Sequence, residues 1–318
     1  MSSFLTLKIN GQDVTVEKGT RVIEAAKLAG AEIAHFCYHP KLKPDANCRM
    51  CLVEIEKMPK LQTSCSTEVA EGMVVQTESD KVKEAQKGVM AFLLGNHPLD
   101  CPECDQGGEC QLQDFAHQHG AMTSPFGEVK RTFEKSYFGP LIEKEMNRCV
   151  SCLRCVRYCD EVIGSNALGS MNRGSMHEVG AFARQELDCE FCGGCVQICP
   201  VGALTSRLSM FDYRTWQLKK TETICNYCGD GCTLTLEAAE EEITRVSSET
   251  GTGRNSGDLC ARGFFGYGAV NHESRLTRPL LRLDSGDLEV TWEWAFNKQW
   301  EASFPPSVRT KRSIFFKN

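Results

Sequence analysis

The sequence has little that would place this chain in a membrane, outside the cell or on a nucleic acid. Aromatic residues make up 8% of its 318 residues, and no apolar run is long enough to cross a bilayer. The first residues carry no basic segment, no twin-arginine pair and no apolar stretch of a signal peptide, so we expect a cytoplasmic protein without direct membrane insertion. The formal net charge of −6 gives no reason to expect nucleic acid as a partner.

Motifs for substrate chemistry are also missing from the sequence. Gly251 and Gly253 form a G-x-G, but no strand–helix pattern surrounds them, as a dinucleotide-binding fingerprint requires. No motif for NAD, flavin, molybdenum or a hydrogen-activating metal is found. We therefore expect no catalytic residue and no substrate-converting site in this chain.

Cysteine, in contrast, is abundant, with 19 residues in the chain. Without an export signal, many cysteines indicate metal ligands rather than disulfides. Metal sites also supply folding energy that small cores cannot, so we expect several small modules instead of one large core.

The densest cysteine pattern consists of two runs that share the spacing C-x2-C-x2-C-x3-C. In two-cluster ferredoxins the last cysteine of each run ligates the cluster of the other run. We therefore assign two [4Fe–4S] clusters, one to Cys149, Cys152, Cys155 and Cys199, and one to Cys159, Cys189, Cys192 and Cys195. Zinc sites and disulfides are the alternatives, but zinc motifs usually pair two C-x2-C halves, and so dense a run would strain disulfides.

The N-terminal residues have the pattern of a hairpin followed by a helix. Residues 4–10 alternate between apolar and polar side chains, and Asn10-Gly11 is a strong hairpin signal. Thr20 is the expected cap of the helix, which is how a β-grasp (ubiquitin-like) domain begins. Four cysteines on one long loop and its flanks then suit a [2Fe–2S] cluster, namely Cys37, Cys48, Cys51 and Cys65.

Two further sets of ligands follow the N-terminal set and the two runs. A helix that Asp80 is expected to cap leads to H-x3-C-x2-C-x5-C, formed by His97, Cys101, Cys104 and Cys110. The last set is C-x2-C-x3-C-x27-C, formed by Cys225, Cys228, Cys232 and Cys260. Spacing alone leaves zinc open at both sites, beside an iron–sulfur cluster.

Several stretches resemble known redox families. Residues 35–54 closely resemble the N-terminal domain of the iron–sulfur subunit of respiratory NADH dehydrogenase, with Ala46 where that family usually has Gly. If the loop requires a positive φ at Ala46, the backbone must adjust. Residues 95–114 resemble the His-ligated [4Fe–4S] site shared by that subunit and iron-only hydrogenases, which favours a cluster with a His97 ligand over zinc.

The final set and the residues after it resemble the [4Fe–4S] domain that opens molybdopterin oxidoreductases such as formate dehydrogenase. That family usually has Lys between cluster and pterin where Arg262 stands, so the resemblance makes Arg262 a cofactor-binding candidate. Many members of the NADH dehydrogenase family keep only the cluster at Cys149, Cys152, Cys155 and Cys199. Because this sequence has all eight cysteines of the two central runs, it is more similar here to the electron-transfer subunits of hydrogenases and NAD-linked formate dehydrogenases. The sequence ends before any molybdopterin domain, so we expect a truncated form.

The arginines beside the cysteines have two interpretations. They either offset cluster charge and tune potentials, or they are ordinary solvated surface residues. The candidates are Arg49, Arg148, Arg154, Arg157 and Arg262.

The expected fold class is α+β, a string of small iron–sulfur modules. The divisions are a β-grasp [2Fe–2S] ferredoxin domain at 1–79, a His-ligated [4Fe–4S] module at 80–140, a two-[4Fe–4S] ferredoxin domain at 141–210, a molybdopterin-oxidoreductase-type [4Fe–4S] domain at 218–280 and a truncated tail at 281–318. The tail is rich in aromatic residues, and it either folds over the chain's own modules or forms a docking surface.

The resemblance implies a multi-cluster electron-transfer subunit with one [2Fe–2S] and four [4Fe–4S] clusters and no flavin or molybdopterin. It would relay electrons between a flavin- and NAD(P)-binding iron–sulfur subunit, with its small [2Fe–2S] companion, and another redox partner. That partner would be a hydrogenase, a formate dehydrogenase or ferredoxin, in a soluble hydrogenase, transhydrogenase or electron-bifurcating complex. The alternatives are the electron-input part of an NAD-dependent formate dehydrogenase or of a respiratory NADH dehydrogenase, and a zinc-scaffold protein.

Overall fold

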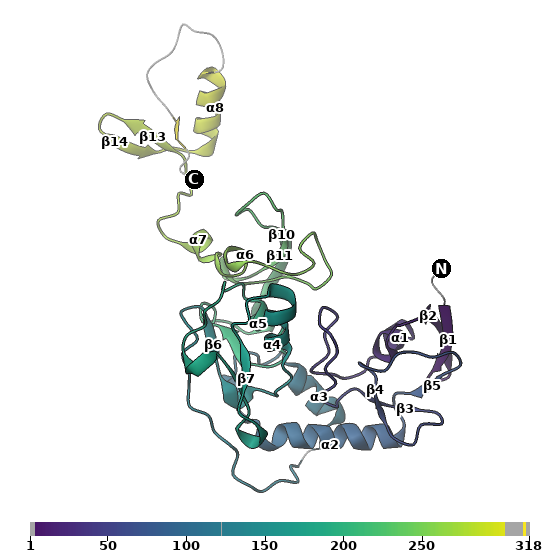
Figure 1. The fold of residues 1–318 in the computed structure, drawn as a ribbon. Coiled ribbons are helices and arrows are strands. Elements are labelled where there is room, and N and C mark those ends of the chain that lie inside the picture. Colours follow the sequence, from purple (N-terminus) through teal and green to yellow (C-terminus); the bar gives the residue numbers. More distant parts are fainter. Residues whose placement is uncertain (1–3, 122, 303–313, 316–318) are drawn as a thin grey trace. The chain divides into compact units, whose positions relative to one another are not determined.

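Residues 4–121, 123–302 and 314–315 are described in the computed structural model (Figure 1). The chain divides into two compact units, Met1–Tyr267 and Gly268–Asn318, which are described separately below. All five ligand sets, His97 included, belong to the first unit.

The first unit begins with a five-stranded mixed sheet and one helix. Its strand order is β2-β1-β5-β3-β4, in which β1 and β5 are parallel and the other neighbours are antiparallel. The predicted hairpin is confirmed, since β1 and β2 pair around Asn10 and Gly11, both with positive φ. The elements are β1 (Phe4–Ile9), β2 (Gln12–Glu17), α1 (Val22–Leu28), β3 (Leu52–Ile55), β4 (Gln62–Thr63) and β5 (Val74–Gln76).

The caps of the first two long helices differ from the predictions. Helix α1 starts after Arg21, whose N–H donates to the Glu24 carboxylate at 3.3 Å, so Thr20 is not its cap. Helix α2 (Asp80–Asn96) is capped by Ser79, whose hydroxyl accepts from the Val82 N–H at 3.4 Å. A serine hydroxyl one position earlier thus takes the role expected of Asp80, which becomes the first helical residue.

Helix α2 and helix α3 (Gln111–His119) belong to a second core that joins distant parts of the sequence. This core packs apolar side chains of α2 and α3 against Phe36 and Met50 of the N-terminal loop and against Val201 and Ala203. Cysteines of three different sets also belong to it, which brings those sets into one region of the molecule: Cys37 and Cys48, Cys110, and Cys149, Cys152 and Cys199.

Short helices and two small sheets make up the middle of the first unit. Helices α4 and α5 pack on each other, as Figure 1 also shows. Strand β6 pairs with β9 and strand β7 with β8, both antiparallel. The elements are β6 (Ile142–Lys144), α4 (Arg154–Tyr158), β7 (Gly169–Met171), β8 (Glu178–Gly180), α5 (Gly194–Gln197) and β9 (Leu204–Ser206).

The first unit ends in an antiparallel three-stranded sheet with one short helix. Strands β10 (Lys219–Ile224), β11 (Thr233–Ala239) and β12 (Glu242–Ser247) pair in sequence order, and helix α6 (Ala261–Phe265) packs on β12. Phe264 and Phe265 of α6 share one continuous core with the middle of the unit.

The second unit is small. Strand β13 pairs antiparallel with both β14 and β15, and Trp292 stacks on Phe296 at a ring distance of 5.7 Å. Its elements are α7 (Gly268–Asn271), β13 (Leu280–Leu283), β14 (Gly286–Glu289), α8 (Trp292–Ala302) and β15 (Ile314–Phe315). Part of the aromatic tail, including Phe304 and Phe316, lies outside the described residues. Within the described residues, no helix has the length and apolarity needed to span a membrane.

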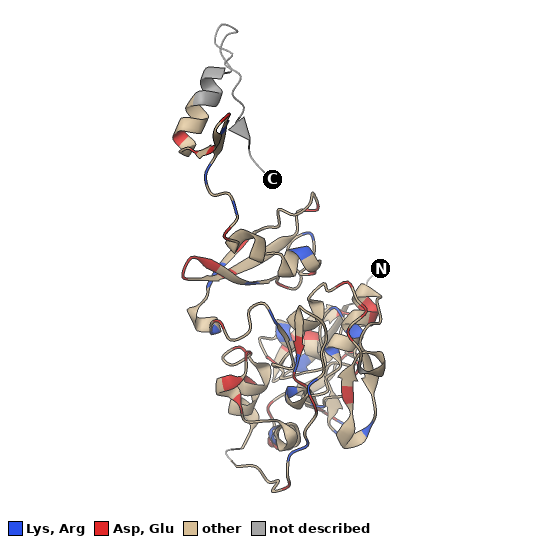
Figure 2. Ribbon diagram, turned by 90° about the vertical axis from the view of Figure 1, so that its left-hand side faces the viewer, with Lys and Arg blue, Asp and Glu red and all other residues tan. Residues whose placement is uncertain are grey.

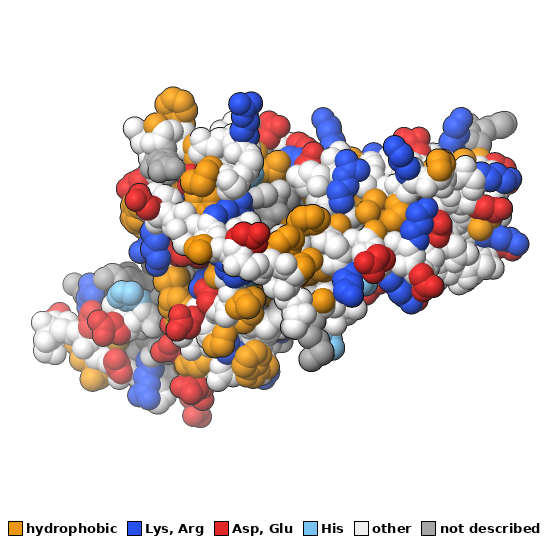
Figure 3. Space-filling model, turned by 90° about the horizontal axis from the view of Figure 1, so that it is seen from below, with side chains coloured by type: hydrophobic (Ala, Val, Ile, Leu, Met, Phe, Trp, Pro, Cys, Tyr) orange, Lys and Arg blue, Asp and Glu red, His pale blue; other side chains and the backbone are white. Residues whose placement is uncertain are grey.

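Basic and acidic residues are interspersed along the ribbon (Figure 2). On the face seen in Figure 3, basic and acidic side chains alternate around apolar ones. Very few charged side chains of the described residues are buried, and these are Lys144, Arg154, Glu178 and Glu237.

Candidate metal centres

The structure gathers the eight cysteines of the two central runs into two groups, each lining its own cavity. One cavity is lined by Cys149, Cys152, Cys155 and Cys199, and the other by Cys159, Cys189, Cys192 and Cys195. The last cysteine of each run therefore lies with the first three of the other run, which is the grouping assigned from the sequence. Ligation by these groups stays a prediction.

The two runs build their cavities with the same backbone. The second and fourth residues after the first cysteine have positive φ in both runs: Ser151 (53°), Leu153 (58°), Phe191 (49°) and Gly193 (78°). In each run this turn leads directly into a helix, α4 or α5. The Cys149 sulfur accepts from the Ser151 N–H at 3.3 Å, and the Cys189 sulfur accepts from the Phe191 N–H at 3.3 Å. Such N–H donors stabilise a thiolate, the form in which cysteine binds iron.

The protonation of these thiols depends on what fills the cavities. Burial raises the pKa of Cys149 to about 11 and of Cys152 to about 12, and the nearby Cys199 thiol adds to both shifts. Burial likewise raises the pKa of Cys195. Four thiolates in one apolar cavity would repel one another, so they ionise together only around a cationic centre. The donor set and its surroundings fit an iron–sulfur cluster.

The N-terminal cysteines converge at one end of the first sheet. Cys37, Cys51 and Cys65 are fully buried, and hydrogen bonds link the Cys37 thiol to Cys48 and to Cys65. These hydrogen bonds lower the pKa of Cys37, and a hydrogen bond from Cys65 lowers the pKa of Cys51. The four sulfur atoms are thus close enough to bind one small cluster.

The loop that carries this set keeps a strained residue. Ala46 has φ of 58° and Arg49 has φ of 57°, both in the left-handed region. The backbone at Ala46 therefore keeps a positive φ, although the residue is not Gly, which the resembling family usually has at this position. Gly adopts this backbone conformation at lower cost than Ala.

The His97 site has an unusual polar atom. His97 follows helix α2 directly, and its Nδ1 is buried without a hydrogen-bond partner. Lys130 fixes the backbone around it by donating to the carbonyls of Leu94, Gly95 and His97. Burial lowers the pKa of His97 to about 4, so the ring is neutral near pH 7, as a metal ligand must be.

The three cysteines of the His97 site differ in exposure. Cys104 and Cys110 are buried, and Cys101 is exposed. Burial raises the pKa of Cys110 to about 11. Gly202, two residues before strand β9, lies against the Cys104 sulfur, and an added Cβ there would overlap it. The site is therefore in contact with the segment that follows Cys199.

The last cysteine set lies where the three-stranded sheet meets helix α6. The Cys225 N–H donates to the Cys232 carbonyl at 2.8 Å, and Cys260 directly precedes the helix. Burial and the neighbouring Asp230 raise the pKa of Cys232 to about 11. Cys228 and Cys260 are exposed. Arg262 is also exposed, and its cofactor-binding role stays a prediction.

Two histidines near the N-terminal set have backbone partners. His35 Nδ1 lies 2.7 Å from the Ile33 carbonyl, and His39 Nδ1 accepts from the Lys41 N–H at 3.3 Å. Both rings thus help to fix the backbone of the loop that carries Cys37.

Within the described part of the chain, no three His, Cys, Asp or Glu side chains are placed to hold one metal ion. In a [4Fe–4S] cluster each ligand binds a different iron atom, so the four ligands lie farther apart than around one zinc.

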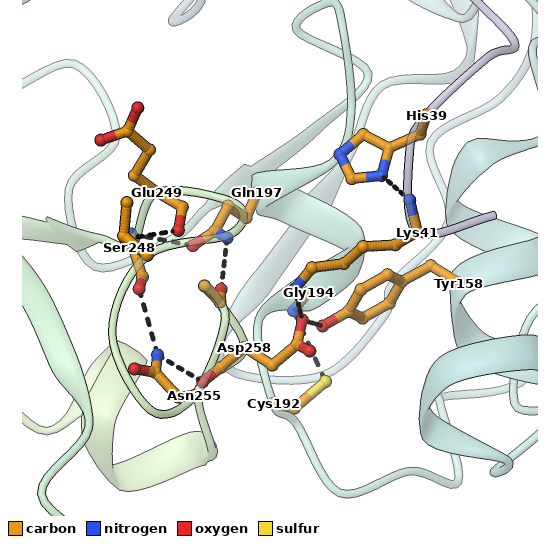
Figure 4. A network of polar contacts seen from close by, with 12 residues as sticks. His39, Lys41, Tyr158, Cys192, Gly194, Gln197, Ser248, Glu249, Asn255 and Asp258 are labelled. Atoms are coloured by element: carbon orange, nitrogen blue, oxygen red, sulfur yellow. Dashed lines mark hydrogen bonds and ion pairs between the residues drawn. The ribbon is translucent and has the colours of Figure 1, made fainter. Parts of the chain in front are cut away.

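Sequence reasoning missed the contacts that join the modules (Figure 4). Lys41 Nζ and the Tyr158 hydroxyl both donate to Asp258 Oδ1, at 2.5 and 2.6 Å. Gln197 donates to the Gly257 carbonyl and accepts from the Ser248 N–H. No local pattern could have revealed these pairs, because the partners are 51 to 217 residues apart in sequence.

Family models match four consecutive stretches of the chain. A 2Fe-2S iron-sulfur cluster binding domain matches residues 2–80, and the NADH-ubiquinone oxidoreductase-G iron-sulfur binding region matches residues 86–125. The ferredoxin-like domain of NADH-quinone oxidoreductase subunit 3 matches residues 139–205, and the molybdopterin oxidoreductase Fe4S4 domain matches residues 218–272.

Whole-chain relatives point to the same family. The chain is 44% identical over 293 residues to an NADH-quinone oxidoreductase subunit of Rhizobium meliloti, covering 92% of this chain and 34% of the relative. It is 42% identical to an NADH-quinone oxidoreductase subunit of Rickettsia bellii, covering 92% and 43%. A crystal structure of an NAD+-reducing [NiFe]-hydrogenase matches with a TM-score of 0.61 and 28% identity, over 66% of this chain and 90% of that one.

The chain is thus an iron–sulfur protein built from [2Fe–2S], [4Fe–4S] and ferredoxin-like domains in series. It is a homologue of these bacterial NADH-quinone oxidoreductase subunits and of the mitochondrial 78 kDa subunit of NADH-ubiquinone oxidoreductase. The chain spans 34% to 43% of the length of the bacterial relatives named above.

Proposed function

We propose that this chain carries one [2Fe–2S] and four [4Fe–4S] clusters and relays electrons in an NAD(P)-linked complex. The ligands are the sets assigned from the sequence, including His97 at one cluster. The observation that carries the proposal is the crossed grouping of eight cysteines around two apolar cavities. Bound clusters would supply one-electron transfer, while the chain holds their thiolates, shields them from water and positions neighbouring modules.

The expected partners lie at the two ends of this relay. One is a flavin- and NAD(P)-binding iron–sulfur subunit with its small [2Fe–2S] companion. The other is a hydrogenase, a formate dehydrogenase or ferredoxin, in a hydrogenase, transhydrogenase or electron-bifurcating complex. The hydrogenase likeness supports such an assembly. We retain the cytoplasmic location, the division into five domains and the role of Arg262 beside the last cluster as parts of this proposal.

A second candidate is a component of a respiratory NADH dehydrogenase. Relatives named as NADH-quinone oxidoreductase subunits, at 42% to 44% identity, favour it. This candidate predicts that the native complex is recovered with membranes and reduces quinone. If the native complex is recovered without membranes and does not reduce quinone, the respiratory candidate is excluded and the relay in a hydrogenase, transhydrogenase or electron-bifurcating complex is favoured.

Two reciprocal variants test the crossed ligand sets. In the full chain, purified without oxygen, Cys199→Ser should remove the electron paramagnetic resonance (EPR) signal of the cluster held by Cys149, Cys152 and Cys155. Cys159→Ser should remove the signal of the other central cluster. Each variant is the matched control of the other. Loss of the same signal in both would contradict the crossed assignment.

Reduction by NADH tests the relay role. Dithionite should reduce the clusters of the isolated chain, whereas NADH should do so only after the flavin-containing partner is added. Oxidation of NADH by the chain alone would overturn the proposal, because it would require a substrate site here.

A further inference from the structure

Arg154 differs from the other buried charged residues. Lys144 and Glu178 form an ion pair at 2.6 Å, and Glu237 pairs with Arg245 at 2.7 Å. Arg154 is 4% exposed and forms no ion pair with a carboxylate among the described residues. Burying a guanidinium without an anion is strongly unfavourable, so a compensating negative charge is expected close to it.

The surroundings of Arg154 identify where that charge would come from. Its Nη1 donates to the Gln111 side chain at 3.1 Å, and its Nε is buried without a partner. Arg154 stands between Cys152 and Cys155 in the sequence, and Cys152 and Cys199 share one core with Cys37 and Cys48 of the N-terminal loop. Arg157, one helical turn further on, bonds the carbonyls of both Cys37 and Cys152. Arg154 is therefore buried where the N-terminal set and the first central set meet.

The other arginines beside cysteines are placed differently. Arg49 and Arg262 are exposed, so solvent screens their charges. Arg148 pairs with Asp100 at 2.6 Å. Arg157 donates to the backbone carbonyls of Cys37, Lys43 and Cys152. At the position of the second run that corresponds to Arg154, the chain has Gly194 instead.

We propose that Arg154 is the shared counter-cation of the N-terminal [2Fe–2S] cluster and of the [4Fe–4S] cluster at Cys149, Cys152, Cys155 and Cys199, and that it raises the midpoint potentials of both. This inference rests on the proposed clusters. An oxidised cluster with four thiolates carries about −2 and gains one more negative charge on reduction. A nearby buried cation therefore stabilises the reduced form more than the oxidised form. Arg154 acts as a positioning residue through its charge, without ligating iron.

An EPR-monitored redox titration of the full chain tests this role. Arg154→Gln removes the charge, Arg154→Lys keeps it, and Arg173→Gln removes a charge from an exposed position of the same domain. In Arg154→Gln the electron affinity of each of the two clusters should fall on the order of tenfold. For a one-electron couple this corresponds to about 59 mV. Arg154→Lys and Arg173→Gln should stay near wild type, and the cluster at Cys225 should not shift in any variant.

Three outcomes would overturn the inference. One is that both clusters keep their midpoint potentials in an Arg154→Gln variant with its full iron content. Another is that Arg173→Gln shifts the two potentials as much as Arg154→Gln does. If Arg154→Gln and Arg154→Lys lose iron at the two sites alike, Arg154 acts through its shape and not its charge. Iron loss in Arg154→Gln alone, restored in Arg154→Lys, supports the inference. A wild-type chain without clusters would instead refute the proposed function, so the two failures are distinguishable.

Discussion

The two central cysteine runs have the same backbone and different neighbours. Three residue pairs at equivalent positions show the difference: Leu153 and Gly193, Arg154 and Gly194, and Arg157 and Gln197. Arg157 binds carbonyls of the N-terminal loop, whereas Gln197 binds backbone groups of residues 248 and 257 beside the last set. At this position the first run therefore holds the N-terminal loop through a cation, whereas the second run holds the segment beside the last set through a neutral amide.

The repeat determines two separate properties, the shape of each cavity and the module that lies beside it. The cysteine spacing and the left-handed residues set the shape of each cavity. The positions between the cysteines decide which module is docked there and how much positive charge lies beside it. An internal repeat can thus provide two similar ligand sets with different electrostatic surroundings.

The largest effect is expected from Gly194→Ala. A Cβ at this position would overlap the buried ring of Tyr158, which the hydrogen bond to Asp258 holds in place. We expect a loss of about 3 kcal/mol in stability, because the ring must shift away from its packed position and from Asp258 to make room for the Cβ. Thermal unfolding of the anaerobic chain measures the change.

Gly88→Ala is the matched control for that substitution. Gly88 lies inside helix α2, and a Cβ there meets nothing within 4 Å. It should stabilise the chain by about 0.5–1 kcal/mol through helix propensity. A similar destabilisation in both variants would contradict the steric explanation for Gly194.

The next effect concerns the docking of the N-terminal loop. Arg157→Ala removes a charged donor from three backbone carbonyls, so we expect a cost of about 2 kcal/mol. Hydrogen exchange should accelerate in residues 37–43 and stay unchanged in residues 248–257.

Gln197→Ala is the converse of that experiment. It should accelerate exchange in residues 248–257 alone, at a smaller cost of about 1 kcal/mol, since its hydrogen bonds are neutral. If both variants loosen both segments, the two halves do not dock their modules independently.

Asp258→Asn should have a smaller effect. The carboxylate accepts from both Lys41 and Tyr158, but its side chain is 34% exposed, so solvent weakens the ion pair. We expect a loss of about 1 kcal/mol or less, which should shrink further at high salt. A loss that does not depend on salt would show that the hydrogen bond from Tyr158, and not the charge of Lys41, accounts for it.

The smallest effect, with the opposite sign, is expected from Ala46→Gly. Relief of the left-handed φ of 58° should stabilise the N-terminal loop by up to about 1 kcal/mol, partly offset by the greater freedom of glycine when unfolded. Ala29→Gly, at the C-cap of α1 where φ is −81°, is the control and should give no stabilisation. Equal effects at both positions would contradict the strain explanation.

Local patterns in the sequence predicted the local structure well. The Asn10-Gly11 hairpin could be inferred because turn chemistry acts over a few residues. The crossed grouping of the central cysteines could be inferred because their spacing is that of two-cluster ferredoxins. The predictions of the two helix caps were each wrong by one residue, since the caps are Arg21 and Ser79. At α2, Ser79 and Asp80 are both good capping residues, and only the backbone decides between them.

Interactions between modules could not be predicted from the sequence. Arg154 and Arg157 lie three residues apart, yet one is buried beside thiols and the other binds carbonyls. Phe92 of α2 is 73% exposed and lies beside Phe126, more than 30 residues further along the chain. Each outcome depends on a segment distant in sequence, about which periodicity and spacing carry no information.

The most direct test of the central claim is a count of iron and zinc in the full chain, purified without oxygen. Five clusters require about 18 iron atoms per chain, two from the [2Fe–2S] cluster and sixteen from the four [4Fe–4S] clusters. We expect this number of iron atoms per chain and negligible zinc. Stoichiometric zinc, with iron well below that number, would contradict it.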